Sequence, residues 1–369
     1  MGTPLRVLHV VVNMNRGGAE TLIMNLYRNI DRSKVQFDFL TCKEGVFDDE
    51  IVKLGGEIHR IPYVTDVGHR GYIKALNNFF STYTQYKIVH SHLDKMSGFV
   101  LRSAKKARVP VRIAHSHSTN SEGGTIAKLY KWYAGAFIAS CATHFLACSA
   151  AAAQWLFANR ESTTKILKNG IECDEFAFNL DIRKRVREEL KLHEDVFVIG
   201  HVGRFSYPKN HTLLIDIFAQ FIEYKPNSIL LLVGDGPLRL EIEKKVEKLN
   251  LTDKVKFLGM RGDINCLLQA FDTFIFPSIY EGLPVTLIEA QGAGLPCIIS
   301  DTITQDVDLG LNLVERCSLL NIRNWIGELQ GITDKQVSRS VAQHVLAEKG
   351  YDIKNITGIT QKFYVAVSR

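Results

Sequence analysis

The 369-residue sequence lacks several features that would place it in a special class of protein. It contains no run of about 18–20 uninterrupted apolar residues, which a membrane-spanning helix requires. The apolar run near Met1 is too short for a signal peptide with its cleavage site, and Arg6 breaks the myristoylation pattern. The seven cysteines are odd in number, widely spaced and without a C-x-x-C, which argues against a disulfide framework or a zinc ribbon. We therefore expect a cytoplasmic protein with reduced thiols.

What is present is typical of a folded globular protein, with 46% hydrophobic and 23% charged residues. At roughly 100–200 residues per domain, the length predicts two domains. The formal net charge is +6, and it is unevenly distributed. Residues 1–175 carry 22 Lys and Arg against 15 Asp and Glu, whereas the remainder carries 23 against 24. The basic excess therefore lies in the first half of the chain.

Short apolar segments alternate with longer stretches that have apolar residues at helical spacing, which predicts parallel sheets covered by helices on both faces. A turn pair, an acidic and aromatic stretch and a charge cluster between Asn169 and Arg187 indicate a domain boundary near residue 175. We predict an α/β architecture of two facing, doubly wound Rossmann-like domains, 1–174 and 175–350, with a ligand cleft at the carboxyl ends of their strands. A helix over 351–369 is predicted to cross back onto the first domain.

The predicted strands of the first half are Arg6–Val12, Val35–Thr41, Lys87–His90, Val111–Ala114, His144–Ala147 and Lys165–Leu167. Those of the second half are Val196–Val202, Ser228–Val233, Val255–Leu258, Thr273–Phe276 and Pro296–Ser300. The predicted helices include Ala19–Ile30, Tyr72–Tyr83, Asn210–Ile222, Pro237–Leu249 and Pro284–Gly292.

The loop Gly203–Asn210 follows a predicted strand and precedes a helix. Its two cations, Arg204 and Lys209, together with a helix N-terminus would suit a diphosphate. Lys and Arg are more often simply solvated at the surface. The position of the loop, at the carboxyl end of a strand, favours binding.

Two carboxylates stand eight residues apart in the segment Ser278–Ala290. Glu281 lies in a loop after a predicted strand, in the turn Glu281-Gly282-Leu283-Pro284. Glu289 lies in a very apolar helix, where a glutamate needs a partner such as a sugar or ribose hydroxyl. The alternative is an ordinary carboxylate near a helix N-terminus. Together with the Arg204 and Lys209 loop, the pair favours a binding function.

Three weaker features follow other predicted strands. The pair Gly17 and Gly18 before a helix could let backbone N–H groups approach an anion, or could serve only a tight turn with positive φ. The segment 234–237, Gly-Asp-Gly-Pro, is interpreted as mostly structural, with Gly234 as possible ligand lining. Met260 and Arg261 could offer backbone groups to a flat base.

Histidine occurs in two H-x-H pairs, His90/His92 and His115/His117, whose members share a face if they lie in strands. No third ligand motif accompanies them in the sequence, so we expect hydrogen bonding to substrate or a structural role and no metal. The triplet Asp306-Val307-Asp308 spells D-x-D, and we interpret it as a loop.

These motifs, in this order, resemble the family 4 retaining glycosyltransferases of GT-B fold. The motifs that carry the resemblance are Gly17-Gly18-Ala19-Glu20, G-R-F-x-x-x-K at 203–209, Gly234-Asp235-Gly236-Pro237, E-G-L-P-x-x-x-x-E at 281–289 and Asn169-Gly170-Ile171. The histidine pairs are similar to those of the exopolysaccharide and capsule branch, the EpsF-type enzymes.

The resemblance implies a nucleotide-diphosphate-sugar donor, expected to be a UDP-sugar. Arg204 and Lys209 would bind its diphosphate and Glu289 its ribose. Glu281 with the backbone of Gly282, Leu283 and Pro284 would hold sugar hydroxyls. Gly17 and Gly18 would lie over the donor phosphates and the acceptor. His115 or His117 would face the sugar, and His117 is preferred.

The implied reaction is sugar transfer with retention, without a metal or other cofactor, in bacterial exopolysaccharide or capsule biosynthesis. Arg204 and Lys209 would stabilise the leaving diphosphate, and a donor phosphate oxygen would take the acceptor proton. Glu281 and His117 complete the set expected to act at the reaction centre, with Glu281 not a nucleophile. The alternative is a nucleotide-sugar epimerase or hydrolase of similar fold, which would need no acceptor.

The basic first half suggests a partner. No helix-turn-helix, zinc finger or RNA-binding aromatic pattern accompanies it, so nucleic acid is not expected. The run from Arg102 to Arg112 carries five cations and no acid. We expect this face to rest on an anionic membrane at the inner face of the plasma membrane, with a glycan or lipid-linked glycan as the acceptor.

Overall fold

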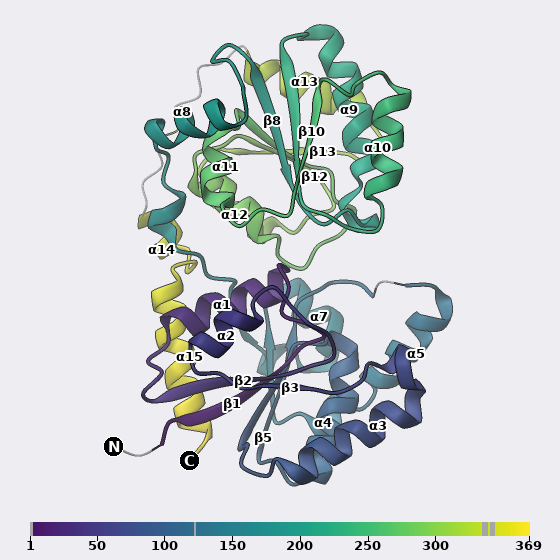
Figure 1. Cartoon of the computed structure of the whole chain (residues 1–369), viewed down its shortest axis with the longest axis vertical. Coiled ribbons are helices and arrows are strands. Elements are labelled where there is room, and N and C mark those ends of the chain that lie inside the picture. Colours follow the sequence, from purple (N-terminus) through teal and green to yellow (C-terminus); the bar gives the residue numbers. More distant parts are fainter. Residues whose placement is uncertain (1–2, 122, 334–338, 340–343) are drawn as a thin grey trace. The chain divides into compact units, whose positions relative to one another are not determined.

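In the computed structural model the chain separates into two units, each built on one parallel sheet (Figure 1). The first unit runs up to Ile171 and includes Gly350–Arg369, and the second is Glu172–Lys349. The structure describes residues 3–121, 123–333, 339 and 344–369. Within these ranges, no helix combines the length and the apolar character needed to cross a bilayer.

The first unit has seven parallel strands in the order β3-β2-β1-β4-β5-β6-β7. The strands are β1 Leu5–Val10, β2 Val35–Thr41, β3 Ile58–Arg60, β4 Ile88–Ser91, β5 Val111–Ser116, β6 His144–Ala147 and β7 Lys165–Ile166. Its helices are α1 Gly18–Asn29, α2 Asp48–Lys53, α3 Val64–Thr82, α4 Ser97–Lys106, α5 Thr125–Gly135, α6 Ile138–Cys141, α7 Ala150–Phe157 and α15 Ile353–Val367.

The second unit has six parallel strands in the order β10-β9-β8-β11-β12-β13. The strands are β8 Phe197–Val202, β9 Ser228–Val233, β10 Val255–Gly259, β11 Thr273–Phe276, β12 Cys297–Ser300 and β13 Val314–Cys317. Its helices are α8 Leu180–Glu189, α9 His211–Tyr224, α10 Arg239–Lys248, α11 Ile264–Ala270, α12 Val285–Gly292, α13 Ile322–Thr333 and α14 His344–Glu348.

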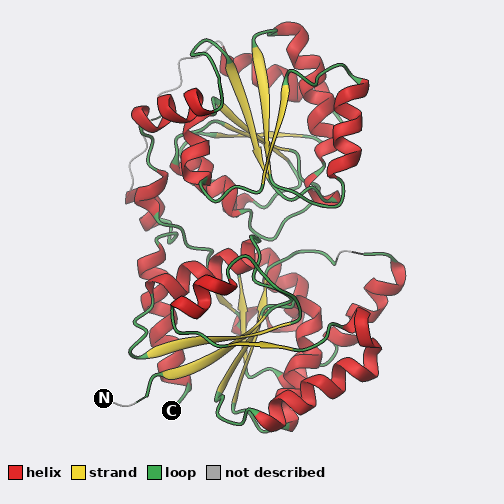
Figure 2. Ribbon diagram, in the orientation of Figure 1, coloured by secondary structure: helices red, strands yellow, loops and turns green. Residues whose placement is uncertain are grey.

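Helices cover both faces of each sheet, as the ribbon shows (Figure 2). In the first unit α15 packs on α1 and β2, so the C-terminal segment completes the N-terminal core. Tyr364 of α15 is fully buried in that core. The second unit has its own core between its sheet and α9, α10 and α13, with Trp325 fully buried. The predicted doubly wound α/β fold is therefore confirmed.

The strand predictions failed where burial is incomplete. Strands β3 and β13 are short edge strands with partly exposed side chains, so they lack the continuous apolar run that identified the buried strands. Helix α5 is not among the helices named from the sequence, and neither are α4, α8, α11 and α13, although α4 is largely buried. Pro284 precedes α12 instead of opening it, and the helix begins at Val285. The units divide after Ile171 and after Lys349, against predicted boundaries at 174/175 and 350/351.

Candidate active site

In each sheet, successive strands of the chain are added first on one side of the first strand and then on its other side. The place where the side changes is the switch point, and ligands bind at such points in open α/β sheets. In the second unit it lies between β8 and β11, because β9 and β10 follow on one side and β12 and β13 on the other. The loop after β8 contains Arg204 and Lys209, and the loop after β11 contains Glu281. A hydrogen bond of 2.7 Å from the N–H of Ile279 to the carbonyl of Pro208 ties the two loops together.

The structure brings Lys209 and Glu281 into direct contact. The ammonium Nζ lies 2.8 Å from Glu281 Oε1, and both side chains are mostly buried. The same Nζ lies 4.5 Å from the ring centroid of Phe276 at the end of β11. The ion pair thus lies at the switch point with both charges largely removed from water. A polar ligand could compete with Glu281 for Lys209, or with Lys209 for Glu281.

Glu289 lies in the second turn of α12 and is only partly exposed. Desolvation by the surrounding apolar atoms raises the pKa of its carboxyl group to about 7. No described residue forms an ion pair with it. The carboxyl group is therefore suited to accept hydrogen bonds from ligand hydroxyls, the interaction that the sequence predicts.

Glycines in the second unit allow two loops to touch through their backbones. A Cβ at Gly234, whose φ is 132°, would lie 2.1 Å from the carbonyl oxygen of Gly203. A Cβ at Gly236 would lie 2.5 Å from the carbonyl oxygen of Phe205. These glycines pack the loop after β9 under the loop that carries Arg204 and Lys209, so their structural role is established by geometry.

The other predicted site residues of this unit differ in their surroundings. Arg204 is exposed, whereas Gly282, Leu283 and Pro284 are buried beneath Glu281. Met260 is half exposed. The guanidinium of Arg261 is held by Asp263 at 2.6 Å and by Glu189 at 3.0 Å, and hydrogen bonding to these carboxylates raises its pKa. A role for the Arg261 side chain in ligand binding would require those ion pairs to open, whereas the predicted role of its backbone would not.

The D-x-D triplet, predicted to be a loop, lies at the end of a short 3-10 helix, Gln305–Val307, and Asp308 follows that helix. Asp306 and Asp308 point outward on either side of buried Val307. Asp308 accepts a hydrogen bond from the N–H of Gly310, a local turn contact.

In the first unit the switch point lies between β1 and β4. Gly17 caps α1 with a φ of −128°, and Gly18 is its first residue. Neither adopts positive φ, so the tight-turn interpretation is wrong. A Cβ at Gly17 would lie 2.3 Å from the Glu20 carboxylate, while a Cβ at Gly18 would meet open space. Gly18 therefore leaves the start of α1 accessible to an approaching group.

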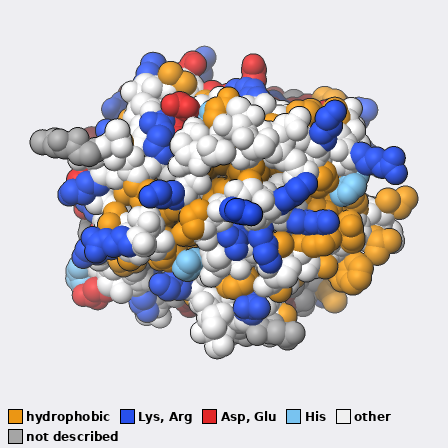
Figure 3. Space-filling view, turned by 90° about the horizontal axis from the view of Figure 1, so that it is seen from below, with side chains coloured by type: hydrophobic (Ala, Val, Ile, Leu, Met, Phe, Trp, Pro, Cys, Tyr) orange, Lys and Arg blue, Asp and Glu red, His pale blue; other side chains and the backbone are white. Residues whose placement is uncertain are grey.

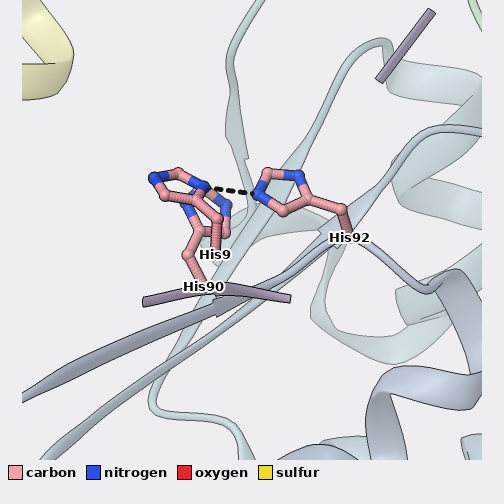
Figure 4. Close-up of side chains that lie close together, drawn as sticks. All are labelled: His9, His90 and His92. Atoms are coloured by element: carbon pink, nitrogen blue, oxygen red, sulfur yellow. Dashed lines mark hydrogen bonds between the residues drawn. The ribbon is translucent and has the colours of Figure 1, made fainter. Parts of the chain in front are cut away.

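Five histidines, of which His117 is partly exposed and the other four are buried, meet at the carboxyl ends of β1, β4 and β5. His9, His90 and His115 lie within these strands, and His92 and His117 follow directly after β4 and β5. His9 and His90 are register partners on neighbouring strands. The rings of each H-x-H pair lie about 4 Å apart, so the predicted shared face is confirmed. Figure 4 shows three of the rings converging.

The ring nitrogens form two hydrogen-bonded chains. In one, His9 Nδ1 lies 3.0 Å from His92 Nε2, and His92 Nδ1 lies 2.9 Å from His117 Nε2. In the other, the Tyr364 hydroxyl lies 2.7 Å from His90 Nδ1, and His90 Nε2 lies 3.1 Å from His115 Nδ1. A neutral imidazole has one N–H, so each chain can run in only two proton arrangements.

Burial keeps these imidazoles neutral. It lowers the pKa of His9 and His117 to about 3, and it lowers the pKa of His90, His92 and His115 well below the ordinary value. Within the described chain, the outer nitrogens His9 Nε2, His115 Nε2 and His117 Nδ1 have no hydrogen-bond partner. The cluster therefore offers polar atoms without charge.

The cluster also supplies the third ligand that the sequence did not show. Two triads, His9/His90/His92 and His92/His115/His117, each place one ring nitrogen per residue within 4.8 Å of the others. Neutral imidazole is a good ligand for zinc-like ions. A metal ion would, however, have to replace the His–His hydrogen bonds that now use many of these nitrogens.

Sequence reasoning missed three contributors to this site. His9 is a lone histidine in an apolar strand, and Tyr364 is 274 residues away from His90. Asp94, in the loop after β4, accepts a hydrogen bond of 2.9 Å from the N–H of His117. Burial raises the pKa of Asp94 to about 6. The signal that could have found Asp94 is its place directly after a strand, two residues beyond an H-x-H pair.

Comparison with known proteins identifies the two units. Residues 182–306 match the family model described as glycosyl transferases group 1, and residues 17–167 match a glycosyl transferase 4-like domain. The first match contains Arg204, Lys209, Glu281 and Glu289. The second contains four of the five histidines.

Relatives extend over nearly the whole chain. A Bacillus subtilis protein named "Putative glycosyltransferase EpsF" is 40% identical over 368 residues, 97% of this chain and 96% of that one. The Escherichia coli enzyme named UDP-Gal:alpha-D-GlcNAc-diphosphoundecaprenol alpha-1,3-galactosyltransferase is 28% identical over 314 residues, 80% of this chain and 79% of that one. A crystal structure of Anabaena Alr3699/HepE with UDP-glucose has a TM-score of 0.81 at 21% identity, covering 98% and 99% of the two chains.

The length and identity of these matches, on a fold of two doubly wound units, place the chain in the group 1 glycosyltransferases: it is a glycosyltransferase of GT-B fold.

Proposed function

We propose that this enzyme transfers a sugar with retention from a UDP-sugar to a glycan or lipid-linked glycan in bacterial exopolysaccharide or capsule biosynthesis. The donor class is supported by the UDP-glucose in the HepE structure and the UDP-Gal in the name of the Escherichia coli relative. The lipid-linked acceptor is supported by the diphosphoundecaprenol in that same name.

One observation carries the proposal: the ion pair of Lys209 with Glu281 at the switch point of the second unit. An arriving diphosphate would replace the carboxylate on the Lys209 ammonium. Glu281 would then be released to accept hydrogen bonds from donor-sugar hydroxyls. Opening the Lys209–Glu281 ion pair thus frees Lys209 for the diphosphate and Glu281 for the sugar at the same time. Binding of the diphosphate and binding of the sugar therefore become coupled.

The neighbouring residues complete the assignment. Arg204, exposed on the same loop as Lys209, adds a second positive charge for the diphosphate. Glu289 receives the ribose hydroxyls. In the first unit, His117 Nδ1 is the outer nitrogen of its histidine chain and is assigned to the donor sugar. Its partner His92 holds the ring in place.

The chemistry follows from these charges. As the bond between the sugar and the β-phosphate breaks, negative charge grows on the diphosphate, where Lys209 and Arg204 stabilise it. A phosphate oxygen of the donor accepts the proton of the acceptor hydroxyl. Because two protein cations neutralise the leaving group, we propose that no metal ion is required. Transfer that persists in EDTA, by protein free of bound metal, is the expected result.

Peripheral contact of the basic first unit with an anionic membrane forms part of this proposal. A lipid-linked acceptor presents its reactive end at a membrane surface. Contact of the enzyme with that membrane surface would bring it close to the reactive end of the acceptor.

The decisive experiment compares Lys209→Ala and Glu281→Ala in sugar transfer and in UDP binding. Each substitution should lower kcat/KM about 100- to 1000-fold, the loss typical of removing a group that stabilises the transition state. UDP affinity should separate the two variants. Lys209→Ala should weaken UDP binding, whereas Glu281→Ala should keep or tighten it because Lys209 loses its competing partner.

The matched control is Lys245→Ala, which removes a surface ion pair with Asp216 in the same unit and should leave both readouts unchanged. Donor alone should yield neither free sugar nor a new sugar nucleotide at the rate of transfer. Full transfer by Lys209→Ala or Glu281→Ala in folded protein would refute the site assignment. Inversion at the anomeric carbon, seen by NMR of the product, would refute retention.

A further inference from the structure

Helix α5 of the first unit presents an apolar stripe to the outside. Ile126 is 86% exposed, Leu129 65%, Trp132 64% and Tyr133 44%. At about 100° per residue these four side chains lie within about one third of the helix circumference. Lys128 is exposed beside the stripe, and α5 contains no acidic residue. Four large apolar side chains on one face of one short helix form a patch, unlike the scattered exposure that is normal for a surface.

The stripe is outward because the other side of α5 is firmly seated. A Cβ at Gly98 of α4 would lie 1.9 Å from the carbonyl oxygen of Ala134, so the two backbones touch. Tyr130 hydrogen-bonds to His69 of α3 at 2.8 Å and contacts the ring of Phe99. Helix α5 is therefore fixed by α3 and α4, and its exposed residues cannot turn inward.

The sequence on either side of α5 is strongly basic. From Lys95 to Arg160, the sequence contains nine Lys and Arg and one acidic residue. Lys106 and Arg108 at the end of α4 are exposed. Arg112, which the sequence placed on this basic face, instead donates hydrogen bonds to the backbone carbonyls of Cys141 and Pro110. Arg112 therefore does not contribute a free cation to the basic face.

Figure 3 shows the face of the molecule seen from below Figure 1. Lys and Arg side chains are spread over it, Asp and Glu lie only near its margins, and hydrophobic side chains gather toward the side on which Figure 1 places α5. Cations and apolar groups thus share one surface.

We propose that α5 inserts its Ile126, Leu129 and Trp132 stripe into the headgroup boundary of an anionic lipid bilayer, while Lys106, Arg108 and Lys128 contact lipid phosphates. The inference deepens the membrane contact of the proposed function, and it names the element that enters the lipid. Apolar side chains with Trp and Tyr next to Lys and Arg are the composition of an interfacial helix. A second copy of the chain on this face would set two basic surfaces against each other, which electrostatic repulsion opposes.

The test is flotation of the full-length protein with vesicles of phosphatidylcholine alone or with 30% phosphatidylglycerol. The wild-type protein should float with the anionic vesicles and lose binding as salt rises. Leu129→Glu should lower vesicle affinity at least tenfold, and Lys106→Ala with Arg108→Ala should remove the preference for phosphatidylglycerol. Leu240→Glu is the matched control, because Leu240 is 71% exposed on α10 of the second unit.

Trp132 provides an independent readout. Its fluorescence, taken as the difference between wild type and Trp132→Phe, should shift to the blue and be quenched by brominated lipids. Equal vesicle binding by Leu129→Glu and Leu240→Glu would overturn the inference. So would a dimer that Leu129→Glu dissolves. UDP affinity should be the same in all these variants, so failure of vesicle binding is distinguishable from failure of the proposed donor site.

Discussion

The two units share one topology but place opposite kinds of side chain at their switch points. In the first unit, His9 and His90 meet on adjacent strands as buried, neutral imidazoles. In the second, Lys209 and Glu281 meet on adjacent loops as a paired cation and anion. Topology therefore decides where functional groups gather, and the local sequence decides whether they carry charge.

The difference has a physical consequence for ligand binding. A cluster of neutral imidazoles can form hydrogen bonds but produces only a weak electrostatic field, whereas Lys209 and Arg204 can stabilise negative charge on a diphosphate. The same difference also predicts different responses to pH. Histidines kept neutral by burial resist protonation in both units, with the cluster of five in the first unit, and Glu289 resists ionisation in the second.

The largest expected effect is stronger acid destabilisation of the first unit than of the second. Unfolding restores each buried histidine to its ordinary pKa of about 6.5, so unfolded chains bind protons that folded ones do not. Stability is complete above that pH and falls as the pH drops toward the folded values of about 3. At pH 5 the loss approaches about 2 kcal/mol per histidine. Hydrogen exchange should show amides of the first unit, with its five clustered histidines, losing more protection between pH 7 and pH 5 than those of the second, where burial lowers the pKa of His201 to about 4 and that of His211 to about 2. Equal loss in both units would contradict this.

Two glycine substitutions should distinguish a glycine that is required for backbone packing from one that leaves space for a ligand. Gly234→Ala forces a Cβ against the Gly203 carbonyl at positive φ, and should cost the second unit about 2–4 kcal/mol of unfolding free energy. Gly18→Ala meets open space and should leave stability within about 0.5 kcal/mol, while lowering sugar transfer if a ligand approaches α1 there. Chemical denaturation and transfer assays measure both. Comparable destabilisation by the two substitutions would remove the contrast.

Glu289→Gln should stabilise the second unit at neutral and alkaline pH. The folded carboxyl group has a pKa of about 7 and the unfolded one of about 4.5, so the wild-type protein loses stability as the pH rises through this window. At pH 8 the amide should be more stable by about 1–3 kcal/mol, and at pH 4 the two should be equal. Thermal melts across pH measure this. The variant should also bind UDP more weakly if Glu289 receives the ribose. A gain that does not depend on pH would refute the titration of Glu289 as its cause.

The smallest effect concerns the link from the C-terminal helix to the histidines. Tyr364→Phe removes the hydroxyl that bonds to His90 and leaves a buried nitrogen unpartnered. We expect a loss of about 1–2 kcal/mol in the first unit, measured by denaturant unfolding. Tyr224→Phe, at a half-exposed tyrosine of the second unit, should change nothing. An unchanged free energy of unfolding in Tyr364→Phe would mean that His90 finds another hydrogen-bond partner.

Much of the fold could be predicted because buried parallel strands are short, continuous apolar runs. The predicted ranges Val35–Thr41, His144–Ala147, Ser228–Val233 and Thr273–Phe276 are those of β2, β6, β9 and β11. The edge strands β3 and β13 escaped prediction because they bury few side chains, and a pattern of buried apolar residues cannot find an element that has few of them.

The second unit's site was also readable in part. Lys209 and Glu281 both follow strands, and the sequence placed them at one edge of the sheet. Their ion pair could not be predicted without the order of the strands. The two loops are adjacent because β11 lies next to β8, whereas β9 and β10 lie on the other side of β8.

The sequence by itself determined the class of fold, the residue types at the carboxyl ends of the strands and the basic excess of the first half. Each of these depends on local pattern or simple composition. Only the tertiary structure decided which groups meet: His9 with His92 across 83 residues, and His90 with Tyr364 across 274. It also decided that Arg112 bonds to backbone carbonyls while the α5 stripe faces outward. Such contacts arise from strand order and helix packing, and these are set by the burial of the whole chain at once.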